Sequence, residues 1–191
     1  MTQHDRMPLK RCPDGLTVLT GGARSGKSDL AERLAAASTA SVTFIATATA
    51  GDADMAARIA RHQTSRSDQW RTIEEPLDLV GALTDAGDIG PVIVDCLTLW
   101  TSNHLFGGVT GAGGSLIEVA DAVAALAVSR LWPTIVVTNE VGFGIHPDTE
   151  LVRSYRDLLG LVNRSFTSVA ARTWLVVAGR VVPLGEPGDL L

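Results

Sequence analysis

The chain has 191 residues, of which 46% are apolar, so it can bury a substantial core and we expect a single domain. Its net charge is −5 and it has no run of lysines or arginines, which argues against nucleic acid as a partner. The longest apolar stretches have the length of a strand and fall far short of the ~20 residues that span a bilayer, so we expect no membrane span.

Residues 1–14 are polar and contain Pro8 and Pro13, so we expect a disordered leader ahead of one domain over residues 15–191. The only cysteines are Cys12 and Cys96, too few for a disulfide framework. Because such cysteine usage suits a reducing compartment, we expect a cytoplasmic protein.

The first apolar run, Leu16–Thr20, predicts a strand, and residues 27–37 predict a helix. Between them lies a glycine-rich turn, and strand, turn and helix together are the context of a phosphate-binding loop. In such a loop the backbone N–H groups and the helix N-terminus bind phosphate, Lys27 reaches the β- and γ-phosphates, and Ser28 binds Mg²⁺. A glycine turn that binds nothing is the alternative, but it would leave both side chains without a use. The predicted loop consists of Gly21, Gly22, Ala23, Arg24, Ser25, Gly26, Lys27 and Ser28.

A strand over Val42–Ala46 and a helix over about residues 53–65 come next. In this helix Arg58, His62 and Arg66 follow one another at four-residue spacing and share one face, an arrangement that favours a bound polyphosphate. Neighbouring positive charge keeps an imidazole neutral and nucleophilic, so His62 could attack an α-phosphorus with pyrophosphate as the leaving group. Spacing alone favours the simpler interpretation, in which His62 is a solvated residue on a basic helical face.

Two acidic residues follow. Glu74 lies in the segment Trp70–Pro76 and could accept a hydrogen bond from a ribose hydroxyl or a guanine edge, although a bare surface acid is equally plausible. Beyond a predicted helix over residues 76–86, the apolar strand Pro91–Asp95 ends in a carboxylate, as in sites where the acid holds Mg²⁺ or its waters. The alternative for Asp95 is a cap on the following turn.

The second half of the chain begins with the glycine-rich stretch 107–115, which we interpret as a surface connection because no strand precedes it and no lysine follows it. Helices are predicted over residues 115–130 and 150–171. Asn139–Pro147 follows a strand at the edge where ligands of open α/β sheets bind, so it is either a second-substrate loop or an ordinary turn.

Strands that alternate with helices predict an α/β fold with a mostly parallel sheet flanked by helices. The segment Trp174–Leu184 is interrupted at Gly179, which predicts an antiparallel hairpin at the sheet edge. The remaining predicted strands are Thr134–Thr138 and Trp174–Ala178.

Several segments in one order resemble the bifunctional adenosylcobinamide kinase / adenosylcobinamide-phosphate guanylyltransferase family of cobalamin assembly. The resemblance implies a RecA-like P-loop NTPase fold and a homotrimer. It also implies phosphorylation of adenosylcobinamide by ATP or GTP, then transfer of GMP from GTP to the adenosylcobinamide phosphate through a guanylylated histidine, with release of pyrophosphate. The segments that carry it are Gly21–Ser28, Phe44–Ala48, Asp54–Ile59 with His62, Trp70–Glu74, Asp95–Trp100, Asn139–Ile145 and Tyr155–Asp157.

The resemblance also assigns roles to single residues. The histidine that matches the guanylylated one is His62, which reverses the simpler interpretation given above. With the roles drawn above from the phosphate-binding loop and the strand before Asp95, His62 and Lys27 are the predicted catalytic residues, and Ser28 and Asp95 the predicted Mg²⁺ ligands. The nucleotide contacts implied are the loop from Gly21 to Ser28 together with Ala46, Thr47, Ala48, Gln63, Thr64, Ser65, Arg66, Glu74 and Asp95.

Overall fold

The computed structural model describes residues 11–49, 70–107, 113–144, 147–186 and 188. Most of the expected leader and the helix predicted over residues 53–65 therefore lie outside the described part of the chain. Among the described residues, no helix is both long and apolar enough to cross a membrane.

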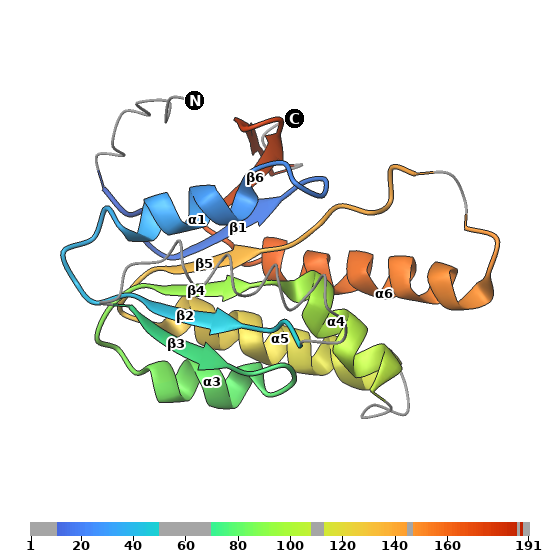
Figure 1. Cartoon of the computed structure of the whole chain (residues 1–191), viewed down its shortest axis with the longest axis horizontal. Coiled ribbons are helices and arrows are strands. Elements are labelled where there is room, and N and C mark those ends of the chain that lie inside the picture. Colours follow the sequence, from blue (N-terminus) through green and yellow to red (C-terminus); the bar gives the residue numbers. More distant parts are fainter. Residues whose placement is uncertain (1–10, 50–69, 108–112, 145–146, 187, 189–191) are drawn as a thin grey trace.

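Seven described strands form one sheet in the order β3-β2-β4-β5-β1-β6-β7 (Figure 1). All neighbouring pairs are parallel except β6 and β7, which form the antiparallel hairpin expected at the end of the chain. This arrangement confirms the mostly parallel α/β sheet predicted from the sequence. The strands are β1 (Leu16–Thr20), β2 (Thr43–Ala46), β3 (Arg71–Glu74), β4 (Val92–Asp95), β5 (Thr134–Val137), β6 (Arg172–Val177) and β7 (Arg180–Leu184).

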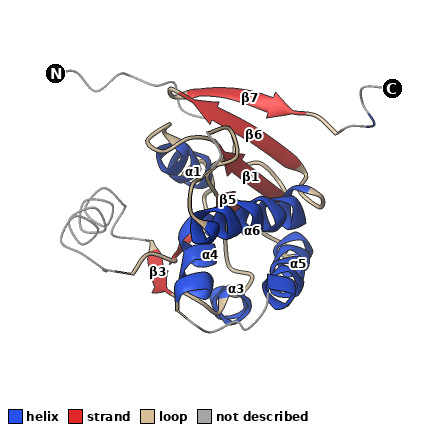
Figure 2. Cartoon of the chain, turned by 90° about the vertical axis from the view of Figure 1, so that its right-hand side faces the viewer, coloured by secondary structure: helices blue, strands red, loops and turns tan. Residues whose placement is uncertain are grey.

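Helices cover both faces of the sheet, with α1 on one face and the other described helices on the opposite face (Figure 2). Figure 1 shows that α6 projects past the carboxyl ends of the strands. The segments that follow the strands at this edge therefore lie beside α6. The described helices are α1 (Lys27–Ala35), α3 (Leu79–Ala86), α4 (Leu97–Phe106), α5 (Gly113–Ser129) and α6 (Glu150–Thr167).

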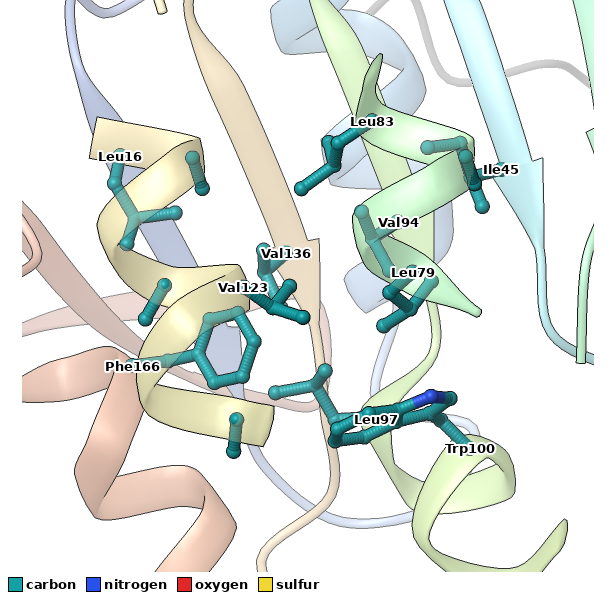
Figure 3. Close-up of a cluster of buried hydrophobic side chains, with 14 of the residues drawn as sticks. Leu16, Ile45, Leu79, Leu83, Val94, Leu97, Trp100, Val123, Val136 and Phe166 are labelled. Atoms are coloured by element: carbon teal, nitrogen blue, oxygen red, sulfur yellow. The ribbon is translucent and has the colours of Figure 1, made fainter. Parts of the chain in front are cut away.

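The protein has two hydrophobic clusters, one on each face of the sheet, because the central strands are buried on both faces. Val94 and Val136 point to the helices α3, α4, α5 and α6, where they meet the fully buried Trp100 and Phe166 (Figure 3). Ile93 and its neighbours on adjacent strands point the other way, onto α1. Burial on both faces removes the polar alternation of a half-exposed strand, which explains the continuous apolar runs in the sequence.

Two elements were missing from the sequence-based predictions. β3 is a largely exposed edge strand, so it has no apolar run to reveal it. α4 buries Thr98, Thr101 and His104 on the same side as Leu97 and Trp100, and this mixture hides the 3.6-residue period of an amphipathic helix.

Element boundaries also differ from the predictions. α3 starts at Leu79 and not at residue 76, because the side chain of Asp78 caps it by accepting a hydrogen bond from the Gly81 N–H at 2.8 Å. α6 ends at Thr167 and not at residue 171. Residues 113–115 already belong to α5, so the predicted surface connection is shorter than expected.

Candidate nucleotide-binding site

The predicted phosphate-binding loop connects β1 to α1, and its first glycine has no room for a side chain. Gly21 has φ of 142°, and a Cβ there would lie 2.2 Å from the carbonyl oxygen of Val176 on the neighbouring strand β6. Gly26, the residue before α1, has φ of 97°. Both backbone conformations favour glycine, so the close packing of the loop depends on these two residues.

Lys27 begins α1 and folds back into the loop. Its side chain is buried, and Nζ donates hydrogen bonds to the carbonyl oxygens of Gly21 at 3.0 Å and Gly22 at 2.6 Å. Ser28 is half-buried in the first turn of the same helix. The structure thus brings a lysine ammonium, a serine hydroxyl and a helix N-terminus together, and all three favour bound phosphate or its metal ion.

The loop is supported from two sides. The Gly179 N–H, in the turn between β6 and β7, donates to the carbonyl oxygen of Ser25 at 2.8 Å. The Glu140 N–H, just beyond β5, donates to the carbonyl oxygen of Gly21 at 3.2 Å. Ala23 and Arg24 are exposed between these supports. The segment after β5 therefore contacts the phosphate-binding loop directly.

The acidic residues predicted for the site lie at the same edge of the sheet but at different distances from the loop. The register pairs Ala46 with both Glu74 and Asp95, so these residues are level at the carboxyl ends of β3, β2 and β4. Only β5 separates β4 from β1, but β3 is four strand spacings from β1, or roughly 19 Å. Asp95 is thus much closer to the loop than Glu74, which is exposed on the edge strand.

Thr47 holds the backbone next to Asp95. Its buried hydroxyl donates to the carbonyl oxygen of Cys96 at 2.8 Å and accepts from the Cys96 N–H at 2.7 Å, while its own N–H donates to the carbonyl oxygen of Asp95 at 3.0 Å. Ala48 follows, half-buried, at the end of this segment. In the structure the side chain of Thr47 therefore orients the turn that carries Asp95.

The hydrogen bonds made by side chains of α4 were missed in the sequence, because Asn103 lies outside every motif and Trp100 was noted only as the end of the segment Asp95–Trp100. Asn103 Nδ2 donates to the carbonyl oxygens of Thr47 at 2.8 Å and Pro76 at 3.1 Å. Trp100 Nε1 donates to the carbonyl oxygen of Leu77 at 2.7 Å. These bonds tie the segment after β2 to the segment after β3. The one available signal was a cluster of polar residues within an otherwise apolar stretch.

Two ionisable groups near Asp95 are held neutral. Burial, and to a smaller extent the Asp95 carboxylate, raise the pKa of Cys96 to about 11. Burial also raises the pKa of Tyr155 to about 12, and its hydroxyl lies 3.1 Å from the carbonyl oxygen of Thr98. Neither group therefore supplies a base near neutral pH.

A magnesium ion is implied by the fold, and the donors at this edge fit it. Among the described residues, no group of three or more His, Cys, Asp or Glu side chains could enclose a metal. Mg²⁺ in nucleotide sites takes one or two protein oxygens and completes its shell with phosphates and water. The hydroxyl of Ser28 and the carboxylate of Asp95 are such oxygens. His62 and the predicted contacts Gln63, Thr64, Ser65 and Arg66 lie outside the described residues.

The glycine-rich loop with its buried lysine, on a mostly parallel sheet flanked by helices, defines an α/β protein of the P-loop NTPase class. Solved structures agree with this fold. The ATPase EscN of the enteropathogenic E. coli type III secretion system matches with a TM-score of 0.57 over 86% of this chain and 43% of its own, at 10% identity. A prototypical ATPase from the type III secretion system of pathogenic bacteria matches with a TM-score of 0.56 over 84% of this chain and 50% of its own, also at 10% identity.

The chain belongs to the cobinamide kinase / cobinamide phosphate guanyltransferase family, whose pattern matches residues 17–184. It is 43% identical to the bifunctional adenosylcobalamin biosynthesis protein CobP of Pseudomonas aeruginosa, over 89% of this chain and 98% of the relative. It is 37% identical to the bifunctional adenosylcobalamin biosynthesis protein CobU of Escherichia coli, over 86% of this chain and 96% of the relative. The family resemblance drawn from the sequence motifs is thereby confirmed.

Proposed function

We propose that this enzyme carries out both reactions of its family, the phosphorylation of adenosylcobinamide and the transfer of GMP from GTP to the resulting phosphate. The observation that supports this most directly is the Gly21–Ser28 loop, closed around the buried ammonium of Lys27, in a chain of this family. The substrates are then ATP or GTP, adenosylcobinamide and adenosylcobinamide phosphate. We further propose a cytoplasmic homotrimer, which light scattering coupled to size-exclusion chromatography tests.

In the kinase reaction, the substrate's hydroxyl oxygen attacks the γ-phosphorus and gives up its proton to solvent. The bond from this phosphorus to the β–γ bridging oxygen breaks, and the nucleoside diphosphate leaves. The loop N–H groups and Lys27 bind the phosphate oxygens, and the negative charge that builds up on them is stabilised by the ammonium and by the N-terminus of α1. Mg²⁺, bound through Ser28 and Asp95, would neutralise charge on the β- and γ-phosphates. In the structure the Lys27 ammonium donates to the carbonyl oxygens of Gly21 and Gly22, so it would exchange these hydrogen bonds for bonds to phosphate oxygens when nucleotide binds.

In the transferase reaction, a ring nitrogen of His62 attacks the α-phosphorus of GTP, and the bond to the α–β bridging oxygen breaks to release pyrophosphate. A phosphate oxygen of adenosylcobinamide phosphate then attacks the guanylyl phosphorus, and the P–N bond breaks to give adenosylcobinamide-GDP. Splitting the transfer into two displacements lowers the barrier of each step. Glu74 is proposed to contact the guanine or ribose of the nucleotide.

The decisive experiment uses GTP labelled at the α-phosphate. We expect an acid-labile, alkali-stable GMP adduct on the wild-type chain, and no adduct on His62→Ala, which should still phosphorylate adenosylcobinamide. Labelling that survives in His62→Ala contradicts the assignment of the nucleophile. Phosphorylation without any adduct on the wild-type chain would indicate a simple kinase, and GTP binding without turnover would indicate a nucleotide-dependent binding protein.

A further inference from the structure

A pocket of about 410 Å³ opens beside the phosphate-binding loop, between the segment after β5 and helix α6. The segment that forms its rim includes Glu140, whose N–H donates to the carbonyl oxygen of Gly21 at 3.2 Å. Because β5 pairs directly with β1, the pocket is next to the strand that leads into the loop. A molecule in this pocket would lie at the same edge of the sheet as a nucleotide's phosphates.

The pocket is built on a fixed hydrogen-bonded wall. The side chain of Asn163 accepts from the Thr138 hydroxyl at 2.7 Å and donates to the carbonyl oxygen of Asn139 at 3.1 Å. Both bonds are made by one lining side chain, and they join α6 to the segment that follows β5. The shape of the pocket therefore follows from the packing of two elements of the fold.

The lining combines apolar surface with a few charges. Val141 and Leu161 contribute side-chain carbon, and Gly160 contributes no side chain at all. Arg156 forms an ion pair with the neighbouring Asp157, with nitrogen and oxygen 3.1 Å apart. The guanidinium of Arg164 has no hydrogen-bond or ion-pair partner among the described residues. It is the lining cation that is open to a ligand.

We propose that this pocket receives the reactive arm of the acceptor, which carries a hydroxyl in the first reaction and a phosphate in the second. The proposal rests on the proposed function. The volume lies at the small end of ligand pockets, which suits a substituted alkyl arm, whereas a whole corrinoid is far larger and its ring must stay outside. The apolar walls suit the carbon chain of the arm, and Arg164 suits the phosphate at its end.

Gly160 offers a direct way to fill the pocket. A Cβ at this position meets no atom within 4 Å, so a larger side chain extends into open space, and replacing glycine in a helix favours the helix. We expect Gly160→Phe to raise KM for adenosylcobinamide by about tenfold or more, because the arm loses its space. Gly160→Ala should change it little. The matched control is Ser154→Phe, an exposed position on the same helix outside the pocket, with KM as in wild type.

A substitution at Arg164 should affect the two acceptors differently, because only one of them carries a phosphate. Arg164→Gln should raise KM for adenosylcobinamide phosphate by about tenfold, through loss of a charge-assisted hydrogen bond, with less than about a twofold change for the unphosphorylated substrate. Arg164→Lys should restore part of the loss. Arg164 is exposed, so this variant keeps the test valid even where Gly160→Phe folds poorly.

Formation of the GMP adduct is measured in every variant, because this step needs GTP and no acceptor. A variant that forms as much GMP adduct as wild type but has a raised KM for the acceptor supports the proposal that the pocket receives the arm. Wild-type KM for both acceptors in Gly160→Phe and Arg164→Gln overturns it and leaves the proposed function intact. A wild-type chain that forms no adduct and phosphorylates no corrinoid overturns the proposed function itself.

Discussion

Replacing Gly21 by alanine tests whether the phosphate-binding loop needs the close approach to β6. The new Cβ would lie 2.2 Å from the carbonyl oxygen of Val176, in a backbone with φ of 142° that L-residues rarely adopt. Strain of this kind costs about 1–3 kcal/mol and overpacking costs a similar amount, so we expect a loss of about 4 kcal/mol in the free energy of unfolding. For a chain of this size that corresponds to a melting temperature lower by roughly 10 °C.

The matched control is Gly22→Ala, one residue further along the same loop. A Cβ at Gly22 meets no atom within 4 Å, so we expect a change of no more than about 0.5 kcal/mol. Thermal unfolding followed by circular dichroism, without nucleotide, compares the two variants. A Gly21→Ala chain that melts within about 2 °C of wild type would refute the packing argument, as would equal losses in both variants.

Two further predictions concern the surroundings of Asp95. Because burial raises the pKa of Cys96 from 9.0 to about 11, the folded thiol keeps a proton that the unfolded thiol has lost, so its contribution to stability is complete below pH 9 and disappears between about pH 9 and 11. Urea unfolding measures the free energy of unfolding across this pH range. As the pH rises from 9 to 11, wild type should lose up to roughly 3 kcal/mol more of this free energy than Cys96→Ser does. Equal losses in the two chains would contradict the raised pKa. Asn103→Leu removes the donor to Thr47 and Pro76, so it should lower the free energy of unfolding, measured in urea, by about 2 kcal/mol. The control Ser102→Ala, at the neighbouring position, should change it little. Equal free energies of unfolding in the two variants would show that these hydrogen bonds contribute nothing.

The phosphate-binding loop could be predicted from the sequence because its residues are consecutive, and the conformation of each depends mainly on its neighbours. Gly21 and Gly26 have the positive φ values expected of such a loop, and Lys27 lies where the motif places it. The position of Asp95 at the end of β4 could also be predicted, because it ends an apolar run, while its role as a magnesium ligand stays a prediction. The antiparallel hairpin was signalled by Gly179, which has φ of 74° in the turn between β6 and β7.

The features that could not be predicted from the sequence depend on contacts between distant parts of the chain. The strand order places Glu74 four strands from the loop, and no local pattern in the sequence specifies that order. Asn103 contacts carbonyl groups 56 and 27 residues earlier in the chain, so its role becomes visible only after folding. The pocket beside α6 likewise arises from the meeting of two segments that are separate in the sequence.

The hydrogen bond from Gly179 to Ser25 has a thermodynamic consequence for the end of the chain. A ligand that stabilises the loop in this conformation would also stabilise the terminal hairpin, and the hairpin would favour ligand binding to the same extent. Amide hydrogens of β6 and β7 should then exchange with deuterium more slowly when nucleotide is bound, although these strands contribute few groups to the phosphate site itself. Amide exchange in the last two strands would thus indicate whether nucleotide is bound to the loop.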